Sequence, residues 1–287
     1  MSDHISLGNA AKLAGNTDLA RRHYQQAFEI AMENGDRFGA ASSMTGLGNI
    51  ALIEGDYAEA ERSQRKAFEI MKEIGNKKGQ ADSLHNLAEI FQILNNLPEA
   101  EQIFEQSRAI SRDIGDRRGE ASTTNSLGVI ADKSGKFAEA ERLFRNCIAI
   151  QTEIGDRRGE ASSLNQLGIN ATNQGNIDDA ENLFRKSIAI KTEIGDRRGE
   201  AISLNNLVGI QFERNNLAEA ERLQRKCIRI DREIGDILAV SRSLINLGII
   251  AYNRGTLEEK HKCFSEAASI QRQLGIPLDQ NLIDEGY

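Results

Sequence analysis

A forty-residue repeat organises almost the whole chain of 287 residues. A Gly-Asp pair, replaced once by Gly-Asn, recurs at 35–36, 75–76, 115–116, 155–156, 195–196 and 235–236. The string EIGDRRGEA is identical at 153–161 and at 193–201. Because the period holds without any insertion, the chain is expected to stack one small structural unit many times.

A second turn signal divides each repeat into two halves. It stands at 15–16, 55–56, 95–96, 135–136, 175–176, 215–216 and 255–256, and every copy begins with Gly or Asn. Gly and Asn tolerate the left-handed conformation that ends a helix, and a following Asp, Asn or Thr can cap the next helix. Glutamates at 59, 99, 139, 219 and 259 stand three residues after that cap, as in a capping box. We therefore predict two helices of about 18 residues in each repeat.

Apolar residues fall into fixed columns with helical spacing. The first helix carries leucine at position 7 and at every fortieth residue up to 247, followed in most repeats by glycine. The second helix carries alanine at 20 and an aromatic residue four places later in most repeats. Residues spaced i, i+3, i+4 and i+7 share a face, so each helix has one stripe that stacked neighbours can bury.

These columns predict an all-α solenoid of about seven antiparallel helix pairs. We expect one continuous array over residues 1–274, with a tail at 275–287 that can form a short capping helix. The predicted pairs are 1–34, 37–74, 77–114, 117–154, 157–194, 197–234 and 237–274.

The combined pattern resembles tetratricopeptide repeats over about residues 1–274. One repeat fits it at Leu164, Leu167, Gly168, Ala171, Ala180, Phe184 and Ser187. The usual repeat has about 34 residues, and the forty-residue form is similar to Leu-Gly-Asn repeat adaptors and many bacterial repeat proteins. The Leu-Gly-Asn motif itself stands at 7–9 and 47–49. The resemblance implies a right-handed superhelix whose concave groove, lined by the first helices, binds peptides or partner segments.

The composition argues against several classes of function. A net charge of −7 does not favour nucleic acid as a partner. No apolar run approaches the roughly 18 residues of a membrane span, and the N-terminal residues lack the layout of a signal peptide, so we expect a cytoplasmic protein without membrane partners. Cys147, Cys227 and Cys263 are too few for a disulfide framework, and the four histidines are scattered. We therefore expect no enzyme, no metal and no cofactor, in a monomer or a weak homo-oligomer.

Asparagines on the first helices form the first candidate binding feature. They lie opposite the predicted core, at Asn86, Asn125, Asn165, Asn205, Asn206 and Asn246. A carboxamide both donates and accepts, so it can pair with an extended backbone whatever the peptide sequence. The resemblance supports this use, because related arrays hold peptides with such a ladder. The alternative is that these side chains cap or bridge adjacent helices.

Aliphatic side chains lie further along the same face. They are Val129, Ile169 and Ile249, joined a turn later by Phe212 and Tyr252. Exposed in line, they would form an apolar floor for a ligand in the C-terminal half. Burial between neighbouring first helices is the alternative.

Arginines at the edge of this face form the third feature. Arg118, Arg158 and Arg198 share a column with Lys78. A guanidinium suits the two oxygens of a carboxylate, so these side chains could clamp acidic residues of a ligand. The alternative is ion pairing between repeats, with acids such as Asp156 and Asp196.

These features give three functional hypotheses. The first is a scaffold or adaptor that binds an extended peptide or a partner segment in the groove. The second is a regulator whose superhelix changes pitch when a signalling peptide binds, as the resemblance to bacterial peptide receptors implies. The third is a structural protein that assembles with itself through the ends of the array.

Overall fold

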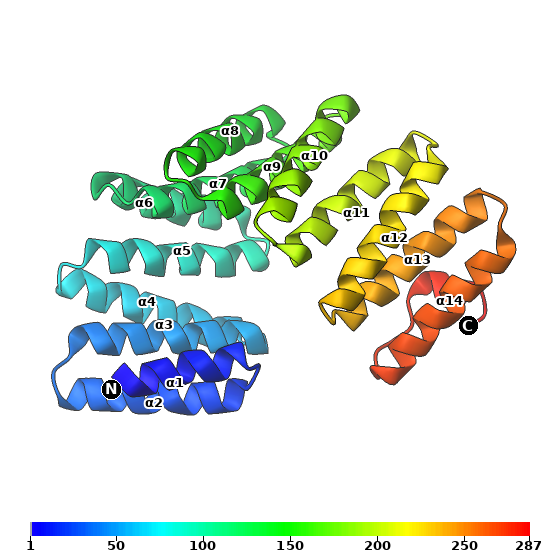
Figure 1. Cartoon of the computed structure of the whole chain (residues 1–287). Coiled ribbons are helices and arrows are strands. Elements are labelled where there is room, and N and C mark those ends of the chain that lie inside the picture. The colour runs from blue at the N-terminus through cyan, green and yellow to red at the C-terminus, as the bar shows by residue number, and fades with distance from the viewer. Residues whose placement is uncertain (1) are drawn as a thin grey trace. The chain divides into compact units, whose positions relative to one another are not determined.

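The computed structural model describes residues 2–287, and these residues form fifteen helices without any strand (Figure 1). Successive helices form antiparallel pairs, and the predicted fold class is confirmed. The helices are α1 Ser2–Leu13, α2 Thr17–Glu33, α3 Arg37–Glu54, α4 Tyr57–Glu73, α5 Lys77–Ile93, α6 Leu97–Asp113, α7 Arg117–Lys133, α8 Phe137–Glu153, α9 Arg157–Asn173, α10 Ile177–Glu193, α11 Arg197–Glu213, α12 Leu217–Glu233, α13 Ile237–Asn253, α14 Leu257–Gln273 and α15 Gln280–Asp284.

The chain forms two compact units, and each is described by itself. Unit 1 comprises the described residues up to Ile150, and unit 2 comprises Gln151–Tyr287. In both units the odd-numbered helix is the first of its pair and the even-numbered helix is the second, up to α14 (Figure 1). The candidate residues from Asn165 to Ile249 all belong to unit 2.

The glycine that follows most of the column leucines is explained by the ring that packs against it. A Cβ added to Gly168 would lie 2.7 Å from Cε1 of Phe184, and one added to Gly248 would lie 2.3 Å from Cε1 of Phe264. Both rings are buried. Glycine at these places therefore lets the two helices of a pair approach closely enough to cover an aromatic side chain.

The pair α11–α12 solves the same packing problem with other residues. Val208 replaces the glycine, and Gln224 replaces the aromatic residue. Both side chains are buried, Gln224 completely. Val208 belongs to the hydrophobic core of unit 2 together with Leu204, Leu207 and Ile210.

The turns confirm part of the predicted capping. Asp196 begins α11 by accepting a hydrogen bond from the N–H of Gly199 at 3.0 Å, and Asp36, Asn76, Asp116, Asp156 and Asp236 do the same for their helices. Asn16 and Asp56 cap second helices in the same way.

The predicted side-chain caps at Asn96, Asn176, Asn216 and Thr256 are wrong, because none of these side chains bonds the first turn. For two of them the structure shows the competing bond. The amide of Asn216 donates to Oε1 of Gln211 at 3.0 Å, and the hydroxyl of Thr256 donates to the carbonyl of Ala251.

The C-terminal tail covers the last helix pair. Leu282 on α15 is completely buried, and Leu278 and Tyr287 pack against the same core, whereas Ile283 points to solvent with 52% of its surface exposed. Lys260, which stands where other repeats have alanine, forms an ion pair with Glu285 at 2.7 Å. The tail thus provides the charge partner for a lysine that the repeat pattern would not place there.

Candidate functional site

Two hollows lie side by side on the first helices of unit 2, one on each side of α11. The α9–α11 hollow has a volume of about 250 Å³ and is lined by Ile169, Thr172, Asn173, Phe184, Asn205, Asn206, Gly209, Ile210 and Glu213. The α11–α13 hollow has a volume of about 270 Å³ and is lined by Asn205, Val208, Gly209, Phe212, Asn246, Ile249 and Ile250. Asn205 and Gly209 line both, so the two hollows adjoin at these residues. We call the two hollows together the inner face of unit 2.

Asn165 lies behind this face and links two helices. Only 7% of its surface is exposed, and its Oδ1 accepts hydrogen bonds from Oγ of Ser203 at 2.8 Å and from Nδ2 of Asn206 at 3.0 Å. Ser203 in turn accepts a hydrogen bond from the buried Nζ of Lys191 at 2.8 Å. In this structure Asn165 therefore bridges α9 and α11, as the alternative interpretation predicted.

Asn205 and Asn246 are the amides that a ligand can reach. Asn205 is half-buried and lines both hollows, and its Oδ1 accepts a hydrogen bond from Nε2 of Gln224 at 3.2 Å. Asn246 is exposed beside the α11–α13 hollow. The bond from Gln224 uses the carboxamide oxygen of Asn205, so its amide nitrogen is the atom that we expect to donate to a ligand carbonyl.

The aliphatic residues are partly buried and partly available. Ile169 and Ile249 are half-buried, and each packs against a core cluster while also lining a hollow. Phe212 behaves in the same way, whereas 57% of Tyr252 is exposed and its ring lies 4.6 Å from Nζ of Lys260. Ile169 and Ile249 are therefore buried along one edge, between neighbouring helices, and exposed along the other, where they line the inner face.

The arginine column pairs with the capping aspartates of the next repeat. Nη2 of Arg198 lies 2.6 Å from Oδ2 of Asp236, and Nε of Arg158 lies 4.0 Å from Oδ2 of Asp196. The N–H of Ala239 and the guanidinium of Arg198 lower the pKa of Asp236 below its usual range. Both arginine side chains remain more than 70% exposed. Ion pairs of this exposure are weak, about 0–1 kcal/mol, so they leave the guanidinium groups accessible.

Unit 1 holds the remaining predicted residues. Asn86 is half-buried, and its amide lies 3.5 Å from Oε1 of Gln64. Asn125 and Val129 on α7 are half-buried, and Arg118 is exposed at the start of that helix. Asn86 also lines a smaller hollow of about 160 Å³ beside His85 and Asp82, and burial raises the pKa of the Asp82 carboxyl.

Sequence reasoning missed Gly209 and Gln224. Both were visible as departures from the repeat: Leu-Val-Gly at 207–209 replaces Leu-Gly followed by a larger residue, and a glutamine replaces the aromatic residue at 224. Their columns lie on different helices, so the sequence alone does not bring them together, whereas the packing of α12 on α11 places Gln224 against Asn205.

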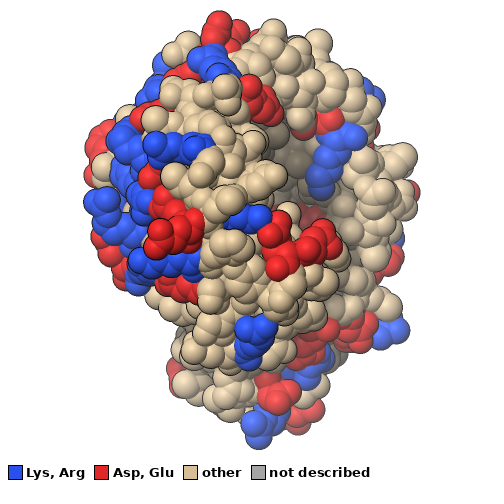
Figure 2. All heavy atoms as spheres, turned by 90° about the vertical axis from the view of Figure 1, so that its right-hand side faces the viewer, with Lys and Arg blue, Asp and Glu red and all other residues tan. Residues whose placement is uncertain are grey.

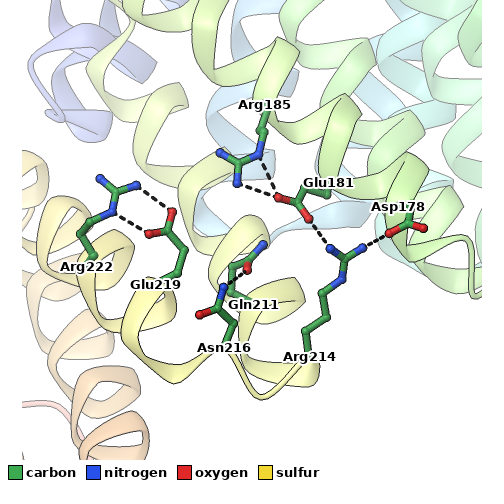
Figure 3. A network of polar contacts seen from close by, with 8 residues as sticks. All are labelled: Asp178, Glu181, Arg185, Gln211, Arg214, Asn216, Glu219 and Arg222. Atoms are coloured by element: carbon green, nitrogen blue, oxygen red, sulfur yellow. Dashed lines mark hydrogen bonds and ion pairs between the residues drawn. The ribbon is translucent and has the colours of Figure 1, made fainter.

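The second helices of unit 2 carry charged side chains of both signs. In the network of Figure 3, Arg214 reaches from the end of α11 to Asp178 and Glu181, and Glu181 also pairs with Arg185. An open depression of about 620 Å³ lies along this network. Figure 2 shows the same interleaving of Lys and Arg with Asp and Glu over one face of the molecule. Charges paired in this way cover a solvated surface and do not concentrate one sign for a ligand.

A crevice between α12 and α14 is the main rival to the inner face within unit 2. Its volume is about 490 Å³, and its lining includes Ile228, Arg229 and Cys263. Ion pairs between α12 and α14 join two residue pairs along it, Arg225 with Glu259 and Arg232 with Glu266. These pairs link α12 and α14 along the crevice and place charges of both signs on its lining.

Reactive groups do not gather on the described residues. No group of three or more His, Cys, Asp or Glu side chains there is placed to hold a metal ion. The three cysteines are buried, and burial raises the pKa of Cys227 to about 12, which keeps this thiol protonated. Within the same residues, no helix combines the length and the apolar character that a membrane crossing requires.

Comparison with known proteins identifies relatives of this architecture. The family model described as "Tetratricopeptide repeat" matches residues 3–73, 79–153, 119–193 and 159–233. No curated protein matches the chain.

Three solved structures illustrate the shared fold. A signal transduction ATPase with a tetratricopeptide repeat sensor from Pyrococcus horikoshii is 17% identical with a TM-score of 0.76, and the match covers 98% of this chain and 43% of that chain. This chain thus spans less than half the length of that protein. Aspartyl phosphate phosphatase F from Bacillus subtilis is 15% identical with a TM-score of 0.65, covering 91% and 68%. The Rap conjugation gene regulator of plasmid pLS20, in complex with the Phr* peptide, is 13% identical with a TM-score of 0.62, covering 85% and 77%. Identities this low show a shared fold alone.

Proposed function

The chain belongs to the tetratricopeptide repeat family, and from that premise we propose that it is an interaction module whose inner face of unit 2 binds an extended peptide segment of a partner protein. The observation that carries the proposal is the pair of adjoining hollows that share Asn205 and Gly209. They combine apolar walls with accessible carboxamides, which is the combination that a peptide backbone with apolar side chains requires.

We give the predicted residues different roles in this proposal, guided by their contacts. Asn205 and Asn246 hydrogen-bond the peptide backbone, and Ile169, Phe212 and Ile249 contact its side chains. Asn165 and Asn206 fix the spacing of α9 and α11 through their mutual hydrogen bond at 3.0 Å. Unit 1 holds four further predicted residues, Asn86, Arg118, Asn125 and Val129. On the first helices of that unit they form a second surface that contacts a peptide.

The fold neighbours support a peptide as the class of ligand. The pLS20 regulator, which shares the fold at 13% identity, is described as bound to the Phr* peptide. A scaffold and a peptide-gated regulator would use the same inner face, and they differ in whether binding changes the arrangement of the repeats.

A random twelve-residue peptide library displayed on phage tests the proposal directly. The immobilised whole chain should enrich a set of related peptides. The double variant Asn205→Ala with Asn246→Ala should bind these peptides about 5- to 150-fold more weakly, because two hydrogen bonds of about 0.5–1.5 kcal/mol each are lost.

Asn182→Ala is the matched control, because Asn182 is an exposed asparagine on the second helix α10. It should bind the peptides as the unchanged chain does, and all variants should keep their helical circular dichroism. Failure to enrich any peptide, or equal binding by the double variant, would contradict the proposed function.

A further inference from the structure

Gly209 is a glycine inside a helix that packing does not explain. It lies in α11, four residues before the helix ends at Glu213, and a Cβ placed on it would meet no heavy atom within 4 Å beyond its chain neighbours and the backbone of its own helix. Gly168 and Gly248 differ, because a Cβ there would lie within 3 Å of an aromatic ring. A glycine in a helix interior costs roughly 0.5–1 kcal/mol relative to alanine. At Gly209 nothing in the core offsets that cost.

The column of Gly209 shows what is missing. The same position carries an asparagine in the first two repeats, a glutamate in the third, and the aliphatic residues Val129, Ile169 and Ile249 elsewhere. Without a side chain at 209, the inner face has a notch between Ile169 and Ile249. The two hollows meet at this notch, since Gly209 lines both of them.

Three departures from the repeat pattern converge on the α11–α13 hollow. Val208 and Gly209 line it, and the buried Gln224 donates to Asn205, which lines it too. Gln224 is completely buried, and its Oε1 has no hydrogen-bond partner among the described residues. An unpaired buried amide oxygen is costly, roughly 1–3 kcal/mol. Core packing accounts for Val208, but it accounts neither for the missing side chain at Gly209 nor for the unpaired oxygen of Gln224, whereas a binding site that orients Asn205 does.

The size and lining of the hollows indicate what they hold. Each is smaller than the roughly 300–1,000 Å³ of a typical small-molecule site, so each has room for one side chain of a longer ligand. The α11–α13 hollow is lined by apolar residues and two asparagines, with no charged side chain. Its lining therefore matches an uncharged, bulky side chain.

We propose that Gly209 opens a specificity subsite that accepts a bulky aliphatic or aromatic side chain of the bound peptide, seated in the α11–α13 hollow against Ile249 and Phe212 while Asn205 holds the adjacent backbone. This inference rests on the proposed function and adds the class of side chain that the inner face selects. Gln224 acts as a positioning residue for Asn205, and Val208 belongs to the hydrophobic core of unit 2.

Restoring a column side chain tests the subsite without harming the fold. Gly209→Ile fills the notch, and because the position is open and helical, the unfolding midpoint should stay the same or rise. Ala189→Ile is the matched control, since it adds an isoleucine at an exposed position of α10 outside the inner face. The probe is a peptide enriched from the random phage library by the unchanged chain, labelled with a fluorophore and titrated by anisotropy.

The expected result has three parts. The enriched peptides share a bulky apolar residue, Gly209→Ile weakens their binding at least tenfold, and Ala189→Ile leaves it unchanged. Replacing that apolar residue of the peptide by alanine should weaken binding to the unchanged chain but have little further effect on Gly209→Ile, because both changes remove the same contact.

The failures of the two proposals are distinguishable. Enriched peptides that bind Gly209→Ile as tightly as the unchanged chain, or that share no bulky apolar residue, overturn the subsite and leave the peptide-binding function standing. Absence of any enriched peptide overturns the proposed function and the subsite with it.

Discussion

At the scale of single residues, unit 2 buries ionisable side chains that the repeat does not require. Asp231 on α12 is 3% exposed, and its Oδ2 accepts a hydrogen bond from Oγ of Ser243 at 3.0 Å. Burial raises the pKa of this carboxyl, and the Ser243 bond offsets part of the effect. The same column carries Lys191 one repeat earlier, where burial lowers the pKa of the ammonium group. Burial therefore disfavours the charged form of both side chains in the folded chain.

Asp231→Asn should therefore stabilise the chain at pH 7. Because the folded state raises the pKa of Asp231, it binds this proton more tightly than the unfolded state does, so the carboxylate costs stability at neutral pH and the cost fades as the pH falls toward about 4. Asparagine is uncharged and can still accept from Ser243. The urea midpoint of the variant should exceed that of the unchanged chain at pH 7, and the difference should shrink at lower pH.

Asp236→Asn provides a control of opposite sign. The N–H of Ala239 and Arg198 lower the pKa of Asp236, so its charged form stabilises the folded chain above about pH 4. Neutralising it should lower the midpoint at pH 7. A urea midpoint for Asp231→Asn below that of the unchanged chain at pH 7 would contradict the prediction, because it would mean that the charged carboxylate stabilises the folded chain.

At the scale of helices, two columns that face each other within a pair vary between repeats. Gly168 faces the ring of Phe184 in α9–α10 and Gly48 faces Gln64 in α3–α4, whereas α11–α12 carries Val208 and Gln224 in the same two columns. Gly168→Val should destabilise the chain by about 1–3 kcal/mol, because its Cβ would overlap the ring of Phe184. Adding Phe184→Gln should recover part of that loss, since it reproduces the arrangement of Val208 and Gln224.

Chemical unfolding of the two single variants and the double variant measures this coupling. Gly168→Ala is a milder control that should fall between the unchanged chain and Gly168→Val. If the losses in unfolding free energy from Gly168→Val and Phe184→Gln simply add in the double variant, then valine and glutamine do not compensate for each other at these two positions.

Helix positions were predictable from the sequence, and most side-chain roles were not. The turn residues recur every forty positions, and glycine or asparagine at the end of each helix takes the positive φ that the turn needs, as at Gly195 and Asn215. Capping by Asn216 was mispredicted because Gln211, five residues earlier, competes for its side chain. The orientation of Asn165 likewise depends on Ser203 and Asn206 one repeat later, and a column of asparagines contains no sign of that partner.

At the scale of the whole molecule, the positions that are constant between repeats stabilise the fold, and the positions that vary are available for specific binding. The columns of leucine, glycine, alanine and aromatic residues are nearly constant, so they determine the stacking of helix pairs in both units. Function belongs to the positions where one repeat departs from the others. In unit 2 the departures at Val208 and Gly209 line the α11–α13 hollow, and Gln224 donates a hydrogen bond to Asn205 beside them.

Methyl NMR of the whole chain with labelled isoleucines tests the central claim most directly. On titration with a peptide enriched from the phage library, the δ1 methyl signals of Ile169 and Ile249 should shift, because these side chains line the two hollows. The signal of Ile228, which lines the rival crevice between α12 and α14, should stay in place. A shift at Ile228 with Ile169 and Ile249 unchanged would contradict the account and place the ligand on the second helices.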